Sequence, residues 1–351
     1  MPMVNQRTNR VREQRLARGL SQAELATRSG LSRAAVSAIE IERLVPSVAA
    51  ALALARVFGC SVEELFGPAT ETQPAWAWQP EREPCRFWRA KVLGRTWLYP
   101  VEPWAANAAA HDGIMEAGTI KETGQSNPEA TLVMASCDPA AGFLAEAFTR
   151  ATGTRLLILQ RSSRQALELL GRGVIHAAGV HFATPAQPEG NARLVREVLG
   201  KGYRLARVST WEEGVCVSSA SQVSTIDEAV RSKLRWVGRD PGSAAGQCLA
   251  ELLPEGSRPR RQAPDHRGVA LAVRWGWADA GICHRYVTEE GGLDFLSVRH
   301  EQYDLCFAEA TAEDSRLVAL LTVLRSASFR KLVSELPGFD SAGAGTVKEV
   351  T

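Results

Sequence analysis

Small and hydrogen-bonding side chains between residues 21 and 43 have the spacing of a helix pair that contacts DNA. Ser21 can cap one helix, and Gly30 can end it, because glycine tolerates the left-handed backbone of a C-terminal cap. Ser32 can cap a second helix that turns apolar side chains inward and small or polar ones outward. The predicted DNA-contacting residues are Gln22, Ser32, Arg33, Ala34, Ser37, Ala38 and Arg43.

These residues divide into base readers and backbone contacts. Arg33 can pair bidentately with guanine, a contact worth about 1–3 kcal/mol of discrimination between bases. Gln22 and Arg43 are better placed for phosphate, which positions a protein on DNA without specifying its sequence. The alternative is an ordinary solvated helix face, and the complete motif favours DNA contact over it.

A second group of polar residues follows the predicted strands of residues 131–340. Ligands of open parallel sheets bind beyond the carboxyl ends of the strands, and helix N-termini there suit anions. The alternatives are ordinary caps, surface arginines and structural histidines. The predicted ligand-binding residues in these loops are Ser136, Asp138, Arg161, Ser162, Ser163, His181, Arg239, Asp240, Gly242, Ser243 and His284. Trp211 joins them because it lies where the chain passes between lobes, either stacking on a ligand or packing the hinge.

The elements that position this second group alternate between apolar strands and helices. Strands are predicted at residues 131–135, 155–159, 174–180 and 203–209, which is typical of a doubly wound parallel sheet. A second series of strands and helices begins at residue 214. Two successive α/β halves predict two lobes with a cleft between them.

Composition gives the remaining boundaries. Prolines indicate a linker before residue 85, and the next stretch predicts a small β-rich unit with a hairpin at Gly94. The predicted organisation is multidomain: an all-α five-helix head at 1–67, a linker at 68–84, a β-rich bridging unit at 85–130, a two-lobed α/β ligand-binding domain at 131–340 and a tail at 341–351.

Charge and cysteine usage bear on partners and compartment. The chain has a formal charge of +2, and residues 1–67 hold nine arginines against six acidic residues. Such a modest excess binds DNA weakly in a single domain, whereas dimerisation doubles the phosphate contacts. The seven cysteines are scattered without a CxxC pair, which argues against a disulfide framework or zinc site. We expect a cytoplasmic homodimer with no metal, cofactor or membrane partner.

Residues 12–66 resemble the Xre-type DNA-binding domains, the group that includes the lambda and 434 repressors. The matching pieces are Gly19-Leu20-Ser21-Gln22, Leu25-Ala26, Gly30-Leu31-Ser32, Val36-Ser37, Ile39-Glu40, Arg43, Pro46-Ser47 and residues 59–66. One departure is Glu42, where the family usually has glycine just before the arginine. Glycine permits positive φ and close approach to phosphate, so an acidic residue leaves that backbone contact open.

Residues 131–340 resemble the type II periplasmic-binding-protein superfamily, in the branch fused to helix-turn-helix domains. The matching pieces are Ala135-Ser136, Arg161-Ser162-Ser163, residues 239–243 and residues 276–282. The last is similar to a segment of molybdate-binding members in which an aromatic hydroxyl follows the strand, and His284 stands near that place here. The resemblance implies a two-lobed domain that closes on a small solute, for example an oxyanion such as molybdate. A neutral metabolite against Trp211, Trp277 and Tyr303 is the alternative.

An enzyme is the competing interpretation. Asp265-His266, Cys283-His284, or Ser136 with Asp138 could supply a nucleophile and a base. The sequence contains no nucleophile elbow, phosphate loop or dinucleotide fingerprint, so we expect no catalytic residues. The predicted function is a ligand-responsive transcriptional regulator whose partners are a double-stranded DNA operator and a small-molecule or oxyanion effector.

Overall fold

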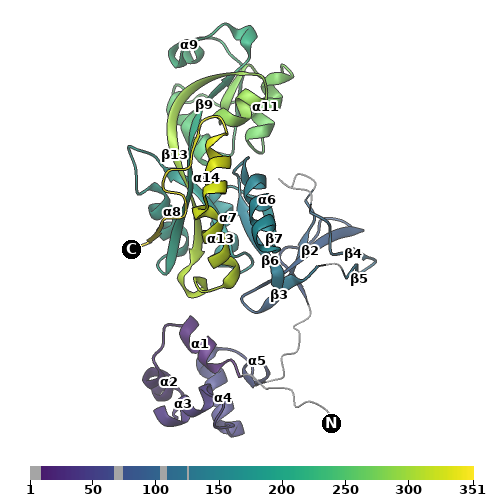
Figure 1. Ribbon diagram of the computed structural model, residues 1–351, viewed down its shortest axis with the longest axis vertical. Helices are drawn as coiled ribbons and strands as arrows, with labels where there is room; N and C mark the ends of the chain where they lie inside the picture. The colour runs from purple at the N-terminus through teal and green to yellow at the C-terminus, as the bar shows by residue number, and fades with distance from the viewer. Residues whose placement is uncertain (1–8, 67–73, 103–108, 125) are drawn as a thin grey trace. The chain divides into compact units, whose positions relative to one another are not determined.

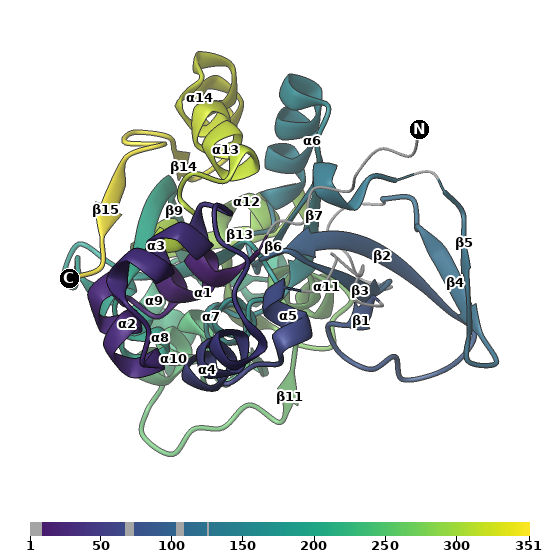
Figure 2. The ribbon, with the colours of Figure 1, turned by 90° about the horizontal axis from the view of Figure 1, so that it is seen from below.

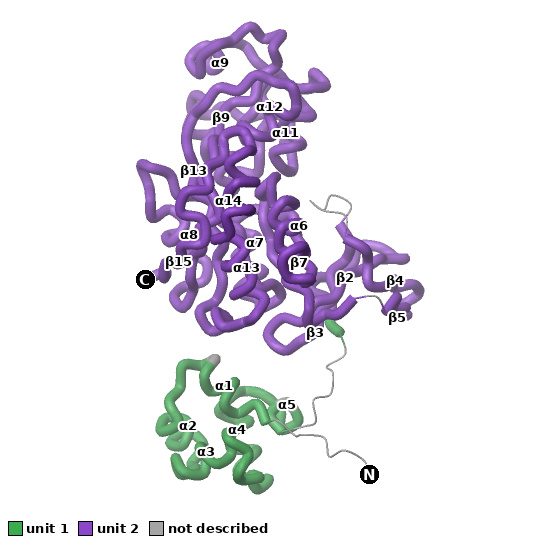
Figure 3. Tube along the Cα trace, viewed as in Figure 1, with its two compact units in different colours: residues 1–75 green, residues 76–351 purple. Residues whose placement is uncertain are grey.

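The computed structural model describes residues 9–66, 74–102, 109–124 and 126–351 (Figure 1). The chain divides into two compact units, residues 1–75 and residues 76–351 (Figure 3). Within the described ranges, no helix is both long enough and apolar enough to cross a membrane.

The first unit is a small helical bundle that follows its local capping signals. Its helices are α1 (Val11–Ala17), α2 (Gln22–Ser29), α3 (Arg33–Glu40), α4 (Val48–Phe58) and α5 (Val62–Phe66). Ser21 and Glu24 form a capping box at the start of α2, and Gly30 ends that helix with a φ of 69°. One apolar core is formed by Leu25, Val36, Ile39, Leu54, Phe58 and their neighbours. The predicted five-helix head is confirmed.

An antiparallel sheet of five strands, in the order β1-β3-β2-β4-β5, precedes the α/β part. Its strands are β1 (Ala75–Trp76), β2 (Cys85–Val92), β3 (Arg95–Pro100), β4 (Gly113–Glu116) and β5 (Thr119–Glu122). The β2–β3 hairpin turns at Gly94, as predicted. The Tyr99 hydroxyl donates to the Val174 carbonyl at 2.6 Å, so the sheet is anchored on the α/β part. Residues 75–76, expected within the linker, instead form β1.

A ten-stranded sheet carries the α/β part. Its strands are β6 (Thr131–Ser136), β7 (Arg155–Gln160), β8 (Ala177–Ala183), β9 (Tyr203–Val217), β10 (Trp236–Gly238), β11 (Arg261–Gln262), β12 (Ala280–His284), β13 (Asp294–Ala308), β14 (Phe339–Asp340) and β15 (Val347–Glu349). The main order is β11-β10-β12-β9-β13-β8-β6-β7, and β14 and β15 also pair with β9. Residues 347–349, expected in a tail, are therefore part of the sheet.

Helices cover this sheet. They are α6 (Ala141–Thr152), α7 (Ser163–Gly171), α8 (Gly190–Leu199), α9 (Ile226–Arg231), α10 (Ala244–Leu252), α11 (His266–Arg274), α12 (Arg285–Glu290), α13 (Ser315–Arg325) and α14 (Ala327–Ser334), with short 3₁₀ turns at Pro128–Ala130, Ser219–Ser221 and Glu309–Thr311. The C-terminal helices α13 and α14 return to pack beside α6 (Figure 2).

Two long strands join the halves of the sheet. β9 and β13 each run for 15 residues and pair antiparallel along their length, with Trp211 opposite Glu301 at the centre. We define lobe 1 as the elements on the β6–β8 side of this centre and lobe 2 as those on the β10–β12 side. The prediction of two separate strands, at 203–209 and from 214, is wrong here, as is that of a wholly parallel sheet. The acidic pair Glu212-Glu213 lies inside one continuous strand.

Candidate functional site

Helix α3 carries most of the residues predicted to contact DNA. Arg33 and Ala34 are exposed, and Ser37 and Ala38 are half-buried further along the helix. The Ser32 hydroxyl accepts a backbone N–H from the first turn at 3.0 Å, so it caps the helix. Arg33 is the first residue of α3 and is exposed, and its contact with a base edge stays a prediction.

A buried ion pair fixes α3 within the bundle. The Arg15 guanidinium contacts both carboxylate oxygens of Glu40, at 2.6 and 3.0 Å. The Gln22 side chain, predicted to face phosphate, donates to the same carboxylate at 2.8 Å. Burial raises the pKa of Glu40, but hydrogen bonds from Arg15 and Gln22 outweigh it and lower the pKa overall. Gln22 thus holds α2 to α3 through its side chain.

Glu42, at the position where the family usually has glycine, adopts the left-handed backbone with a φ of 61°. Its carboxylate accepts the backbone N–H of Asn9 at 3.0 Å, and the Asn9 side chain donates to the Ile39 carbonyl at 2.6 Å. The turn is therefore preserved without glycine, at a steric cost of about 1–2 kcal/mol.

Replacing Glu42 with glycine should relieve this cost and raise the free energy of unfolding by about 1 kcal/mol. It should also tighten DNA binding several-fold, because a negative charge leaves the segment next to Arg43. Urea unfolding and anisotropy of a labelled duplex measure the two effects. The matched variant Glu42→Ala removes the charge but keeps the strain, so it should improve binding alone. Equal stability of the two variants would contradict the strain argument.

Arg33 and Arg43, both exposed, should have different effects on DNA binding. Arg33→Ala is expected to cost about 1–3 kcal/mol and to relax base preference at one position. Arg43→Ala is expected to weaken binding to all sequences alike and to reduce the salt dependence. Affinities for a selected duplex and its single-base variants distinguish these effects. Unchanged affinity and specificity for Arg33→Ala would remove it from the reading face.

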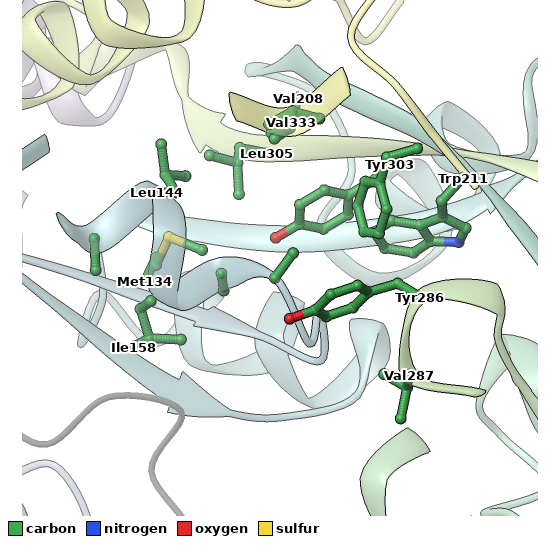
Figure 4. Packing of buried hydrophobic residues seen from close by; sticks show 14 of the residues in the cluster. Met134, Leu144, Ile158, Val208, Trp211, Tyr286, Val287, Tyr303, Leu305 and Val333 are labelled. Carbon is green, nitrogen blue, oxygen red and sulfur yellow. The ribbon is translucent and has the colours of Figure 1, made fainter. Parts of the chain in front are cut away.

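Buried charged and aromatic side chains meet at the middle of β9 and β13. Glu301 accepts hydrogen bonds from His181 Nδ1 at 2.7 Å and from Arg299, whose nearest guanidinium nitrogen is 2.6 Å away. The Trp211 indole N–H donates to the same carboxylate at 3.4 Å, and Tyr303 stacks on Trp211 at 4.7 Å between ring centroids (Figure 4). We call these side chains and their neighbours the hinge cluster. Its members are Cys137, His181, Trp211, Glu213, Arg299, Glu301 and Tyr303.

The pKa values of two carboxyl groups in the hinge cluster are shifted in opposite directions. Burial raises the pKa of Glu301, but His181 and Arg299 outweigh it and lower the pKa to about 2. Burial, the charge of Glu301 and a hydrogen bond to the Glu301 carboxylate all raise the pKa of Glu213. Potential donor atoms of His181, Glu213 and Glu301 lie within 4.8 Å of one another. These three residues are therefore the ones that could hold a metal ion.

Lobe 1 meets the hinge cluster through the loop after β6. The Ser136 hydroxyl hydrogen-bonds to the Tyr303 hydroxyl at 2.6 Å and accepts the Asp138 N–H at 3.0 Å. Burial raises the pKa of Asp138 to about 7, although the Ala140 N–H and His181 act in the opposite direction. The predicted residues Ser136, Asp138 and His181 are thus brought together.

Asp138 makes stability depend on pH. Its native pKa of about 7 lies above the ordinary aspartate value of 3.8, so the native state binds the proton more tightly than the unfolded chain. The stabilisation from this proton is complete below pH 4 and is lost as pH rises to about 7. Asp138→Asn should therefore raise the melting temperature by several degrees more at pH 8 than at pH 5. The same gain at both values would contradict the assignment.

Lobe 2 contributes unpaired polar atoms. Arg239 Nε and Nη1, both ring nitrogens of His284 and Nδ1 of His266 are buried without a hydrogen-bond partner among the described residues. The His284 ring lies 4.2 Å from Trp211 and 4.9 Å from His266 between centroids. Burial lowers the pKa of His284 to about 3 and also lowers that of His266, so both rings are neutral at pH 7.

Other predicted ligand residues of the β7–α7 loop are placed differently. Arg161 pairs with Glu102 and lies over the Trp78 ring at 4.9 Å, so it is engaged on the surface. Ser162 caps α7. The neighbouring Ser163 fits the prediction better, since its hydroxyl is buried and has no partner among the described residues.

The predicted ligand residues of the loop before α10 also divide into residues that stabilise the turn and one buried residue with unpaired donors. Ser243 caps α10, its hydroxyl also donating to the Asp240 carbonyl at 2.6 Å, and the Gly242 N–H donates to the Asp240 carboxylate. These three residues form an ordinary turn, whereas Arg239 before them is 6% exposed with unpaired donors. Trp277, expected in an aromatic ligand wall, is 56% exposed and packs against Trp275 instead.

A groove of about 870 Å³ opens next to the loop after β6. Pro139, Phe143, Arg267 and Tyr286 are among its lining residues. The Arg267 guanidinium donates to the Pro139 carbonyl at 3.1 Å, which joins lobe 2 to lobe 1. Most of the lining comes from α6, α13 and α14, and Arg267 and Tyr286 add residues of lobe 2 to it.

Sequence reasoning missed five residues of this region: Cys137, Glu213, His266 as a ligand contact, Arg299 and Glu301. The available signal was charge inside apolar strands. Glu213 and Glu301 lie in stretches with strand-like apolar neighbours, and a buried carboxylate needs a partner or a ligand. Glu213 and Glu301 are 88 positions apart in the chain, so their spacing did not show that they meet across β9 and β13.

Comparison with known proteins gives the following matches. A family model described as "PBP superfamily domain" matches residues 145–325, and one described as "Helix-turn-helix" matches residues 11–65. The uncharacterized protein YvgK of Bacillus subtilis is 26% identical over 186 residues, which cover 50% of this chain and 60% of that relative. The match thus spans less than two thirds of the relative's length.

Solved structures are similar to the second unit at low sequence identity. A binding-protein component of a phosphonate transporter from Pseudomonas aeruginosa is 10% identical, with 62% of this chain and 81% of that chain covered and a TM-score of 0.44. A phosphate transport receptor from Vibrio cholerae is 12% identical, with coverage of 58% and 97% and a TM-score of 0.42.

The bounds of the two family matches coincide with helices of the structure. The helix-turn-helix match coincides with α1–α5, and the other match begins in α6 and ends with α13. The chain therefore belongs to the periplasmic-binding-protein superfamily and carries an Xre-type helix-turn-helix domain at its N-terminus.

Proposed function

We propose that this ligand-sensing regulator binds an operator through α3 and a small effector between lobe 1 and lobe 2. The effector stabilises the closed arrangement of the lobes, and closure changes the affinity of the N-terminal domain for DNA. A ligand shifts such an equilibrium only by its differential affinity for the two states.

The unpaired polar atoms between the lobes carry this proposal. Arg239 and His284 are each buried with two polar atoms that lack a partner among the described residues, and His266 is buried with one such atom. Leaving one buried group unsatisfied costs about 1–3 kcal/mol, more for a charged group. Three such residues around one junction are expensive for a purely structural core. A bound effector would satisfy them.

An oxyanion such as molybdate is the first candidate effector. Arg239 supplies two free N–H donors, and Ser163 supplies a buried hydroxyl. Burial raises the pKa of Asp138, and a protonated carboxyl donates a hydrogen bond to an oxyanion instead of repelling it. A neutral aromatic metabolite is the second candidate, favoured by the Trp211–Tyr303 stack and the neutral His284 ring.

A cytoplasmic homodimer is the proposed working form. Operator DNA is bound in the compartment that holds the chromosome, and two copies would place two recognition helices in successive major grooves. Val45 and Val48, after α3, are 87% and 77% exposed and offer apolar surface to a second copy.

A thermal-shift screen of the full chain tests the effector site. Molybdate, phosphate, sulfate, carboxylates and nucleosides form the panel, since a ligand at 100 times its Kd adds about 2.7 kcal/mol of stability. Arg239→Ala should abolish the shift. The matched control Arg235→Ala, whose guanidinium is paired with Asp279 at the surface, should keep it. A stabilising ligand that is indifferent to Arg239 would place the site elsewhere.

A further inference from the structure

A cysteine, a histidine and a glutamate form a continuous chain of hydrogen bonds in the hinge cluster. Cys137 Sγ lies 2.9 Å from His181 Nε2, and His181 Nδ1 lies 2.7 Å from Glu301 Oε2. Cys137 follows the last residue of β6, His181 lies in β8, and Glu301 lies in β13. Three separate elements therefore converge to hold one thiol against one imidazole.

This order of groups is that of an activated nucleophile. A thiol is activated by a base within hydrogen-bond reach, and the base is in turn oriented by a third group. Here His181 is the base and Glu301 is the third group, through the two contacts given above. Asp138 from the neighbouring loop and Glu213 from β9 are the other acidic groups close to the ring.

The neighbouring polar groups point to a reactant in this position. Glu213 is fully buried, hydrogen-bonds to Glu301, and belongs with His181 and Glu301 to a group whose potential ligand atoms lie within 4.8 Å of one another. Both ring nitrogens of His284, whose ring lies 4.2 Å from that of Trp211 between centroids, have no partner among the described residues. The thiol thus lies in a buried polar region that includes an imidazole without partners.

Other buried cysteines of the same unit lack such a base. Burial raises the pKa of Cys216 to about 12, and it raises the pKa of Cys248 and Cys283 as well. Cys283 donates to the His266 carbonyl at 3.3 Å, a contact that offers no base. These thiols are expected to be inert.

A groove next to the loop that holds Cys137 offers a surface for an organic reactant. Its lining includes Pro139, two residues after Cys137, and the aromatic rings of Phe143, Tyr286 and Phe329. Aromatic walls favour an organic reactant over a small inorganic oxidant.

We propose that Cys137 is a covalent capture site for small α,β-unsaturated carbonyl compounds. His181 Nε2 takes the thiol proton of Cys137 as the sulfur attacks the β-carbon and forms the S–C bond, while the π pair of the alkene moves toward the carbonyl to give an enolate. The enolate then takes the proton from His181 Nε2, which leaves a neutral imidazole. Nothing is oxidised or reduced. This inference does not depend on the proposed effector or on DNA binding.

N-ethylmaleimide, an α,β-unsaturated imide, is the probe. The full chain is treated with one equivalent at pH 6 and sampled over time, and peptide mass spectrometry gives the rate at each cysteine. Cys137 should react at least tenfold faster than the half-buried Cys60, despite its own burial. His181→Gln should lower the Cys137 rate at least tenfold and leave the Cys60 rate unchanged.

His176→Gln is the matched control. His176 is also a buried histidine of lobe 1, but its hydrogen bonds within the described part of the chain go to the backbone of Val133 and Lys91. Its replacement should leave the Cys137 rate as in the parent chain, and continued protection of Cys283 reports that each variant is folded. A Cys137 rate no higher than that of Cys283, or one indifferent to His181→Gln, would overturn the proposal. Oxidation of Cys137 by hydrogen peroxide without maleimide addition would overturn the class of reactant.

Discussion

Glu301→Ala is expected to lower the free energy of unfolding of the second unit by about 3–5 kcal/mol. The Glu301 side chain is fully buried and is paired with both His181 and Arg299. Its removal leaves two cationic groups in the interior without their shared carboxylate. Breaking one side of a buried pair costs far more than the pair itself contributes, because the remaining charge stays desolvated.

Urea unfolding measures this loss. Tryptophan fluorescence monitors the transition, because the Trp211 indole contacts the Glu301 carboxylate. The matched control is Glu251→Ala, because Glu251 also pairs with Arg299, at 3.1 Å, but from a side chain that is 69% exposed. That control should cost less than about 1 kcal/mol. If the two variants lost similar stability, Glu301 would not be the shared anchor of the hinge cluster.

Glu40→Ala is expected to unfold the N-terminal domain while the second unit stays folded. The Glu40 side chain is 1% exposed, and its loss strands the Arg15 guanidinium and the Gln22 amide inside the bundle. The cost of about 3–5 kcal/mol equals much of the stability of a domain of this size. Sequence-independent DNA binding should disappear together with the first step of thermal unfolding.

A compensating double variant separates charge from packing. Arg15→Met with Glu40→Leu removes both partners of the ion pair, and apolar replacement of a buried pair is often neutral or stabilising. The double variant should again show the first step of thermal unfolding, which reports a folded N-terminal domain. The single variant Arg15→Met should lack this step. A double variant as unstable as Glu40→Ala would mean that the network acts through its hydrogen-bond geometry.

The N-terminal domain was predictable because its signals are local. Ser21, Gly30 and Ser32 fix helix ends through contacts within a few residues, and the structure places the ends there. The long-range pair of Arg15 and Glu40 was not predicted. The spacing of charged residues along the chain does not show which of them are buried in the folded domain.

The ligand site was predictable only in outline. The rule that ligands bind at strand ends selected the loops of Ser136, Arg239 and His284, whose side chains are buried in the structure. It also selected Arg161 and Ser243, which serve as a surface contact and a cap. Within one loop the sequence cannot tell a capping serine from a buried one, because both occupy the same helix start.

The hinge cluster escaped prediction because β9 and β13 are unusually long. A strand of 15 residues with acidic residues in its middle has the sequence pattern of two strands and a turn. Antiparallel pairing of β9 with β13 then brings Trp211 opposite Glu301. The pairing partner of a strand is a property of topology, so the charges that meet there could not be matched in advance.

Coupling between effector and operator is the central claim, and anisotropy of a labelled operator measures it most directly. A duplex selected from a random library by the full chain is titrated with and without a saturating ligand from the thermal-shift panel. We predict that the ligand changes the Kd for DNA at least fivefold, about 1 kcal/mol or more of coupling, and that Arg239→Ala abolishes the change. The same Kd with and without a ligand that demonstrably stabilises the chain would contradict the account.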